Sequence, residues 1–322
     1  MAFGISGVGC FVLGAASCAI GAPEAYHDRL SDVAPILWYS MSASAGNEAN
    51  RGTLGGTHDA TYNGTVARGV ATFAGDSAAG FNGADDFLES IGLSPLTGNP
   101  DCTLEAIVNL TPAGNAALWG PFLHWGQGGT GREVYFSVSN NLNTRPYVGF
   151  YNAGLRTTEA VPTGEWIHVV WQRRGGSGSN SGSRLFVNGV SVSLQVDPGL
   201  SPGFLNASQI DVLATTFRVN RATDVIGTRR FEGAIDELAL FDRRLSTTEI
   251  RMNAAASGLM VLGSCPGDAS GDGVVNFDDL NIVLTEFASQ GAGFDGDFDL
   301  SGVVDFVDLN TVLSSFGVDC TE

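Results

Sequence analysis

Oxygen-bearing side chains recur at alternate positions in two segments near the end of the chain. In each segment, positions 1, 3, 5, 9 and 12 carry a side-chain oxygen, and position 7 is a valine that offers its backbone carbonyl. The first set is Asp268, Ser270, Asp272, Val274, Asn276 and Asp279, and the second set, 29 residues on, is Asp297, Asp299, Ser301, Val303, Asp305 and Asp308. Glycine at position 6 lets the chain turn sharply, so these oxygens converge. Because Ca²⁺ prefers about six to eight hard oxygen ligands, the spacing predicts two calcium loops, each with one ion.

An apolar stripe at helical spacing follows each loop. The stripes are Leu280, Val283, Leu284 and Phe287, and Leu309, Val312, Leu313 and Phe316. Residues with this spacing share one face of a helix, so we expect one amphipathic helix after each loop and none before it. The repeat predicts a small all-α module at 265–322. An acidic, turn-rich tail without metal is the alternative.

Two cysteines bracket this acidic module. Residues 265–322 hold twelve Asp and Glu and no Arg, in a chain whose net charge is −18. We expect Cys265 and Cys320 to form a disulfide that clamps the two ends, which implies an oxidising compartment. Cys102 lies at the head of an apolar strand, where a buried free thiol is the simpler interpretation.

The N-terminal segment and the overall charge indicate where the protein works. Residues 7–22 form an uncharged run of small and apolar residues that is too short for a membrane span. This run favours a secretory signal at 1–22, with a buried first strand as the alternative. We expect a secreted or cell-surface protein with no membrane span in the mature chain. The strong negative charge argues against nucleic acid as a partner.

Alternating apolar residues predict many short strands between residues 23 and 257. Strand-like segments include 104–110, 134–138 and 166–171, and Asn188-Gly189 is a hairpin turn. Ser246 and Glu249 form a capping box that opens a short helix ending near residue 256. Such strands, joined by Gly-rich turns, are typical of an antiparallel two-sheet sandwich or jelly roll. We therefore expect a mainly β domain at 23–257 and a linker at 258–264.

Seven motifs in this β domain follow the order seen in one known family. They lie at 25–39, 59–64, 81–89, 103–106, 162–169, 185–189 and 231–250. The first of them, 25–39, resembles the opening strand of that family. In these motifs the domain resembles the laminin-G-like branch of the concanavalin A-like lectin/glucanase superfamily. The resemblance implies a jelly roll that binds carbohydrate or an extracellular protein. Some members bind calcium at an acidic position comparable to Asp236. A further calcium ion in the jelly roll is therefore an open alternative.

The C-terminal module resembles a second family. A loop and its exit helix, present twice with Asp279 and Asp308 at position 12 instead of Glu, resemble the type I dockerin module. The resemblance implies docking to a cohesin-like partner. Positions 10 and 11 are Phe277-Asp278 and Phe306-Val307, not the usual Ser-Thr pair of that family. A dockerin-like module with a different partner is therefore an equal alternative.

The sequence shows no catalytic constellation. Glucanases with this fold place a pair of carboxylates on one strand as E-x-D-x-x-E or E-x-D-x-E, and no such string occurs. Asp236 and Glu237 are adjacent, so we expect them on opposite strand faces. The His residues lack metal-ligand spacing, and His168 is expected in the core. We expect a non-catalytic recognition or adhesion protein. The alternative is a polysaccharide-degrading glycoside hydrolase that carries a dockerin.

Two tryptophans are candidates for contact with a carbohydrate. Trp119 and Trp125 lie near Gly- and Pro-rich loops, and a flat aromatic face matches the C–H face of a sugar ring. Core packing is the alternative for both residues.

Overall fold

The protein is described by a computed structural model over residues 23–72, 76–111, 120–138, 144–198, 200–222, 230–260 and 265–320. The expected signal segment 1–22 and the expected sugar contact Trp119 lie outside these residues. None of the described helices is long and apolar enough to cross a membrane.

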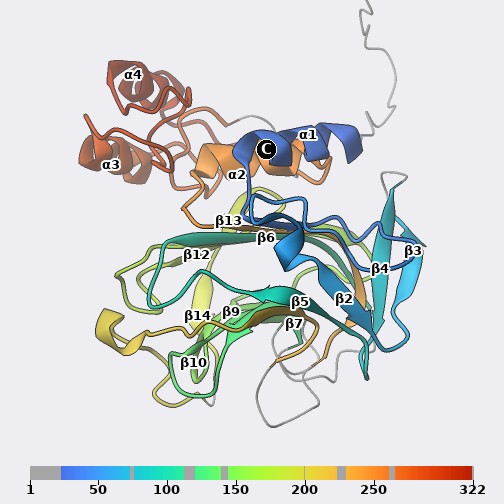
Figure 1. The fold of residues 1–322 in the computed structure, drawn as a ribbon. Helices are drawn as coiled ribbons and strands as arrows, with labels where there is room; N and C mark the ends of the chain where they lie inside the picture. Colours follow the sequence, from blue (N-terminus) through green and yellow to red (C-terminus); the bar gives the residue numbers. More distant parts are fainter. Residues whose placement is uncertain are drawn as a thin grey trace, which may run out of the picture.

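Two antiparallel sheets form the body of the molecule (Figure 1). Sheet A has the spatial order β13 (Val190–Val192), β12 (Ser183–Val187), β11 (Trp166–Arg173), β6 (Cys102–Leu110), β16 (Glu232–Phe241), β4 (Ser77–Asn82) and β3 (Ala67–Ala71), and β1 (Leu37–Tyr39) also pairs with β16. Sheet B has the order β14 (Leu194–Val196), β10 (Ala153–Thr157), β9 (Pro146–Phe150), β8 (Glu133–Val138), β7 (Pro121–Gly126), β15 (Thr216–Val219), β5 (Phe87–Leu93) and β2 (Ala60–Asn63). Two short 3₁₀ helices lie at Gly55–His58 and Ala207–Gln209.

The main core lies between the two sheets. Ile167, Val169 and Trp171 of β11 point into it, while Val170 of the same strand packs in a second apolar cluster on the outer face of sheet A. Both faces of this central strand are therefore buried. The mainly β two-sheet fold expected from the sequence is confirmed.

Two helices cover the outer face of sheet A (Figure 1). The capping box at Ser246 and Glu249 opens α2 (Thr247–Ala256), as expected. The other helix, α1 (Pro23–Val33), falls where the motif comparison predicted part of an opening strand, and that prediction was wrong. Tyr26, Leu30 and Val33 are buried at helical spacing, so a helix buries their side chains on one face.

The C-terminal module contains α3 (Phe277–Glu286) and α4 (Phe306–Ser315), which lie beyond α2 in Figure 1. Val283 and Val312 lie at the centre of its own apolar cluster. The expected Cys265–Cys320 disulfide is confirmed, with 5.9 Å between the two Cα atoms. Cys102 is a buried free thiol, and burial raises its pKa to about 12.

Candidate functional site

Both predicted calcium loops fold around the carboxylate at position 12. In the first loop, Asp279 accepts hydrogen bonds from the backbone N–H groups of Ser270 at 2.9 Å and Asn276 at 2.7 Å. In the second loop, Asp308 accepts them from Phe298 and Asp305 at 2.8 and 2.9 Å. This repeated bonding fixes both carboxylates inside their loops.

Acidic oxygens converge most closely in the second loop. Carboxylate oxygens of Asp297, Asp299 and Asp308 lie within 4.8 Å of one another. Burial raises the pKa of Asp297, and the charge of Asp308 raises it further. Like charges held this close favour a bound cation, and an all-oxygen donor set fits calcium.

The first loop is tied to the body of the molecule. Arg251 of α2 contacts Asp268, the residue at position 1, with 2.5 Å between Nη2 and Oδ2. The same carboxylate oxygen accepts the N–H of Gly273 at 2.8 Å. Because both side chains are almost fully buried, this ion pair couples the first loop to α2.

Asp295 forms a second connection between the module and the body. Its carboxylate accepts hydrogen bonds from Arg184 at 2.8 Å and Arg244 at 3.1 Å, and from the backbone N–H and hydroxyl of Thr247 at 3.0 and 2.9 Å. The backbone N–H of Ser191, on edge strand β13, donates to the carbonyl of Gly271 at 2.8 Å. The module thus caps one edge of sheet A.

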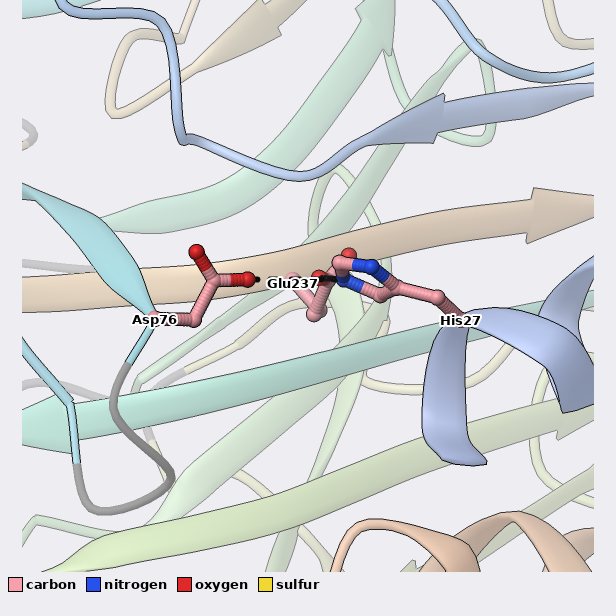
Figure 2. A group of neighbouring side chains, drawn as sticks. All are labelled: His27, Asp76 and Glu237. Atoms are coloured by element: carbon pink, nitrogen blue, oxygen red, sulfur yellow. Dashed lines mark hydrogen bonds and ion pairs between the residues drawn. The ribbon is translucent and has the colours of Figure 1, made fainter. Parts of the chain in front are cut away.

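A cluster of potential metal ligands lies on the outer face of sheet A. Figure 2 shows His27 from α1, Asp76 before β4 and Glu237 from β16 pointing toward one another. Nε2 of His27 contacts Oε1 of Glu237 and lies 3.6 Å from Oδ2 of Asp76. Trp38 donates its indole N–H to Oε2 of Glu237 at 2.5 Å. Sequence analysis alone could not identify this cluster, because its members come from three segments that are distant in the sequence.

Asp236 belongs to the same surface, which corrects the expectation that it faces away from Glu237. The pairing of β16 with β6 has a bulge between Ile235 and Glu237, and Asp236 is the extra residue. Burial, together with the charges of Glu237 and Asp76, raises the pKa of Asp236 to about 8. Its Oδ1 atom is buried without a hydrogen-bond partner.

A buried polar network lies between α1, α2 and sheet A. Glu105 accepts hydrogen bonds from Tyr26 at 2.5 Å and Asn253 at 2.8 Å, and it pairs with His168 at 2.7 Å. This arrangement confirms the expected core position of His168. On the outer face of sheet B, His124 is also fully buried and lies 3.2 Å from Glu133.

Trp125 is not a ligand-contacting residue, and that prediction was wrong. Its side chain is 1% exposed in the main core, and its indole N–H donates to the carbonyl of Leu96 at 3.0 Å. Trp125 lies on β7, where alternation turns it inward. No face of the ring is free to stack on a sugar.

Comparison with known proteins gives one family and several similar folds. A family model described as the concanavalin A-like lectin/glucanases superfamily matches residues 81–251. No curated protein matches the chain. One similar structure is domain 4 of AbnA, a GH43 extracellular arabinanase from Geobacillus stearothermophilus, in complex with arabinotriose. Its identity is 16% and its TM-score 0.46, and the similarity covers 69% of this chain and 98% of that chain.

Two further similar structures are longer than the matched region. The sialidase of Trypanosoma rangeli is 16% identical to this chain, with a TM-score of 0.48. The similarity covers 69% of this chain and 32% of the sialidase chain. The binding domain of botulinum neurotoxin serotype D is 10% identical to this chain, with a TM-score of 0.49. The similarity covers 69% of this chain and 51% of that chain. The present chain therefore spans only part of either protein.

Proposed function

The chain belongs to the concanavalin A-like lectin/glucanases superfamily, and from this premise we propose that it is an exported, non-catalytic recognition protein. The jelly roll at 23–257 binds carbohydrate or an extracellular protein. The dockerin-like module at 265–322, after the linker 258–264, binds two Ca²⁺ ions and docks to a cohesin-like partner. Residues 1–22 act as the secretory signal, so the mature protein is secreted or held at the cell surface.

One observation carries the calcium part of this proposal. The second loop gathers Asp297, Asp299 and Asp308 within 4.8 Å. The position-12 carboxylate accepts a hydrogen bond from the backbone N–H of position 9 in both loops. It accepts a second one from position 3 in the first loop and from position 2 in the second loop. Calcium bound there would neutralise the carboxylates, and metal binding would be coupled to folding of the module.

Exposed aromatic side chains support the docking role. Phe277 and Phe306 occupy position 10 of the two loops and are 69% and 75% exposed. Each packs edge-on against the phenylalanine that follows the helix of the other repeat. The ring centroids are 5.0 Å apart for Phe277 and Phe316 and 5.1 Å apart for Phe306 and Phe287. Two equivalent apolar patches suit a partner with an apolar surface.

Docking is tested with the calcium-loaded chain against a panel of immobilised cohesin domains. We expect the double variant Phe277→Ser, Phe306→Ser to lose binding, since both equivalent patches are removed. The control is Phe204→Ser, which removes a 57% exposed phenylalanine from the body. If the wild-type chain binds no cohesin, the cohesin-like partner is wrong.

Recognition by the jelly roll is tested on a panel of polysaccharides and glycans, with released reducing ends assayed in the same wells. Binding without release is the expected result. Release of reducing ends would instead support a glycoside hydrolase that carries a dockerin.

A specific observation favours that second candidate. The fold brings together Asp76 and Glu237, two carboxylates distant in sequence, with donor oxygens within 4.8 Å. Retaining glycosidases use carboxylates about 5 Å apart. However, Glu237 is only 2% exposed beneath α1, which leaves little access for a sugar chain.

A further inference from the structure

The cluster around His27 contains the donor types of a transition-metal site. It offers one imidazole nitrogen and the carboxylates of Asp76 and Glu237, whose donor atoms lie within 4.8 Å of one another. Two ligands about 2.0 Å from a tetrahedral metal are a little over 3 Å apart. The 3.6 Å between Nε2 of His27 and Oδ2 of Asp76 is close to that separation.

A second observation points to a cation at the same place. Asp236 is 4% exposed, and its Oδ1 atom has no hydrogen-bond partner. The bulge in β16 places this residue beside Glu237, and the charges of Glu237 and Asp76 act on its carboxylate. A buried carboxylate oxygen without a donor is costly, and a bound cation removes that cost.

The cluster also has the outer support that metal ligands need. The indole N–H of Trp38 holds Oε2 of Glu237, and the Trp38 ring lies edge-on to His27 with 5.4 Å between centroids. Such outer contacts fix the orientation of a metal-binding carboxylate.

We propose that His27, Asp76 and Glu237 bind one transition-metal ion of the Zn²⁺ class on the outer face of sheet A, with Asp236 next to Glu237 on the bulge of β16. Imidazole nitrogen suits Zn²⁺ and its neighbours, whereas Ca²⁺ and Mg²⁺ take oxygen ligands. The ion would fasten α1 to β16 and to the segment that enters β4. This site is distinct in position and donor set from the two all-oxygen loops of the C-terminal module.

The experiment uses the chain from residue 23 onward, stripped of metal and then returned to excess calcium. Zn²⁺ is the probe, and bound zinc and calcium are counted separately by elemental analysis after gel filtration. We expect one zinc per chain that excess calcium does not displace. Because the calcium loops are counted on their own, loss of zinc and loss of calcium are distinguishable results.

Variants identify the ligands. Asp76→Asn removes a part-exposed ligand, and we expect zinc affinity to fall by at least about 100-fold, since loss of an outer-shell contact alone costs about 10- to 100-fold. His27→Gln, which keeps the length of a polar side chain, should have the same effect. Asp28→Asn is the matched control, because it removes an exposed charge from the same helix.

Two results would overturn the proposal. One is a wild-type chain that retains no zinc in calcium. The other is zinc binding that Asp76→Asn and His27→Gln leave unchanged while both variants fold as wild type by circular dichroism. A calcium ion that is bound at this cluster and lost in Asp76→Asn would also refute the transition-metal assignment.

Discussion

Asp295 should control how firmly the C-terminal module is held against the body. Asp295→Asn keeps the size of the side chain and an oxygen for Thr247 but removes the charge that faces Arg184 and Arg244. A hydrogen bond to a charged group is worth about 1.5–3 kcal/mol, which gives about 3–6 kcal/mol for two. Arg184 and Arg244 are 27% and 15% exposed, so solvent screening lowers the expected loss to about 2–4 kcal/mol.

Hydrogen exchange measures this loss directly. The N–H of Ser191 donates to Gly271 across the interface, so peptides spanning 189–193 report docking. In calcium, a loss of about 2–4 kcal/mol corresponds to exchange roughly 30- to 1,000-fold faster at this amide. The control Asp278→Asn removes an exposed charge from the same module and should change nothing. Equal protection of Ser191 in wild type and Asp295→Asn would refute the reasoning.

Three further predictions concern stability and reactivity. Replacing Cys265 and Cys320 by serine should cost about 4 kcal/mol of the module's free energy of unfolding, because the bond closes a loop with a sequence separation of 55; denaturant unfolding in calcium checks this. Burial alone raises the pKa of Glu105, but the charge of His168 and the hydrogen bonds to Glu105 outweigh burial and leave that pKa below its ordinary value. The stability that ionised Glu105 contributes should be complete above about pH 4.3 and should be lost as the pH falls further, so wild type should lose its advantage over Glu105→Gln in acid urea titrations. Cys102 should resist a thiol reagent at pH 8 in the native chain from residue 23 and react once the chain is unfolded, because burial raises its pKa to about 12.

The features that the sequence predicts correctly are local. The capping box that begins α2 involves Ser246 and Glu249, which lie close together in the sequence. The start of this helix can therefore be recognised without the rest of the fold. The loop–helix repeats are recognisable for the same reason, because each loop's oxygens lie within one short segment. Cys265 and Cys320 could be paired because they flank a single module.

The features that sequence reasoning missed depend on tertiary contacts. The bulge at Asp236 arises from the register between β16 and β6, and strict alternation places this residue on the wrong face. Helix α1 is stabilised by burial of Tyr26 and Leu30 against sheet A, and nothing within the segment itself shows that surface. In the sequence Trp125 lies next to a Gly-rich turn, but its position on β7 directs its side chain into the core.

Calcium binding by the C-terminal module is the central claim, and a titration of the metal-free chain with calcium tests it most directly. Isothermal titration calorimetry counts the ions, and far-ultraviolet circular dichroism follows α3 and α4 in the same samples. We predict two ions for wild type, one for Asp279→Asn and one for Asp308→Asn, with a loose module in chelator that gains helix as calcium binds. No heat of binding, together with an unchanged spectrum across the titration, would contradict the account.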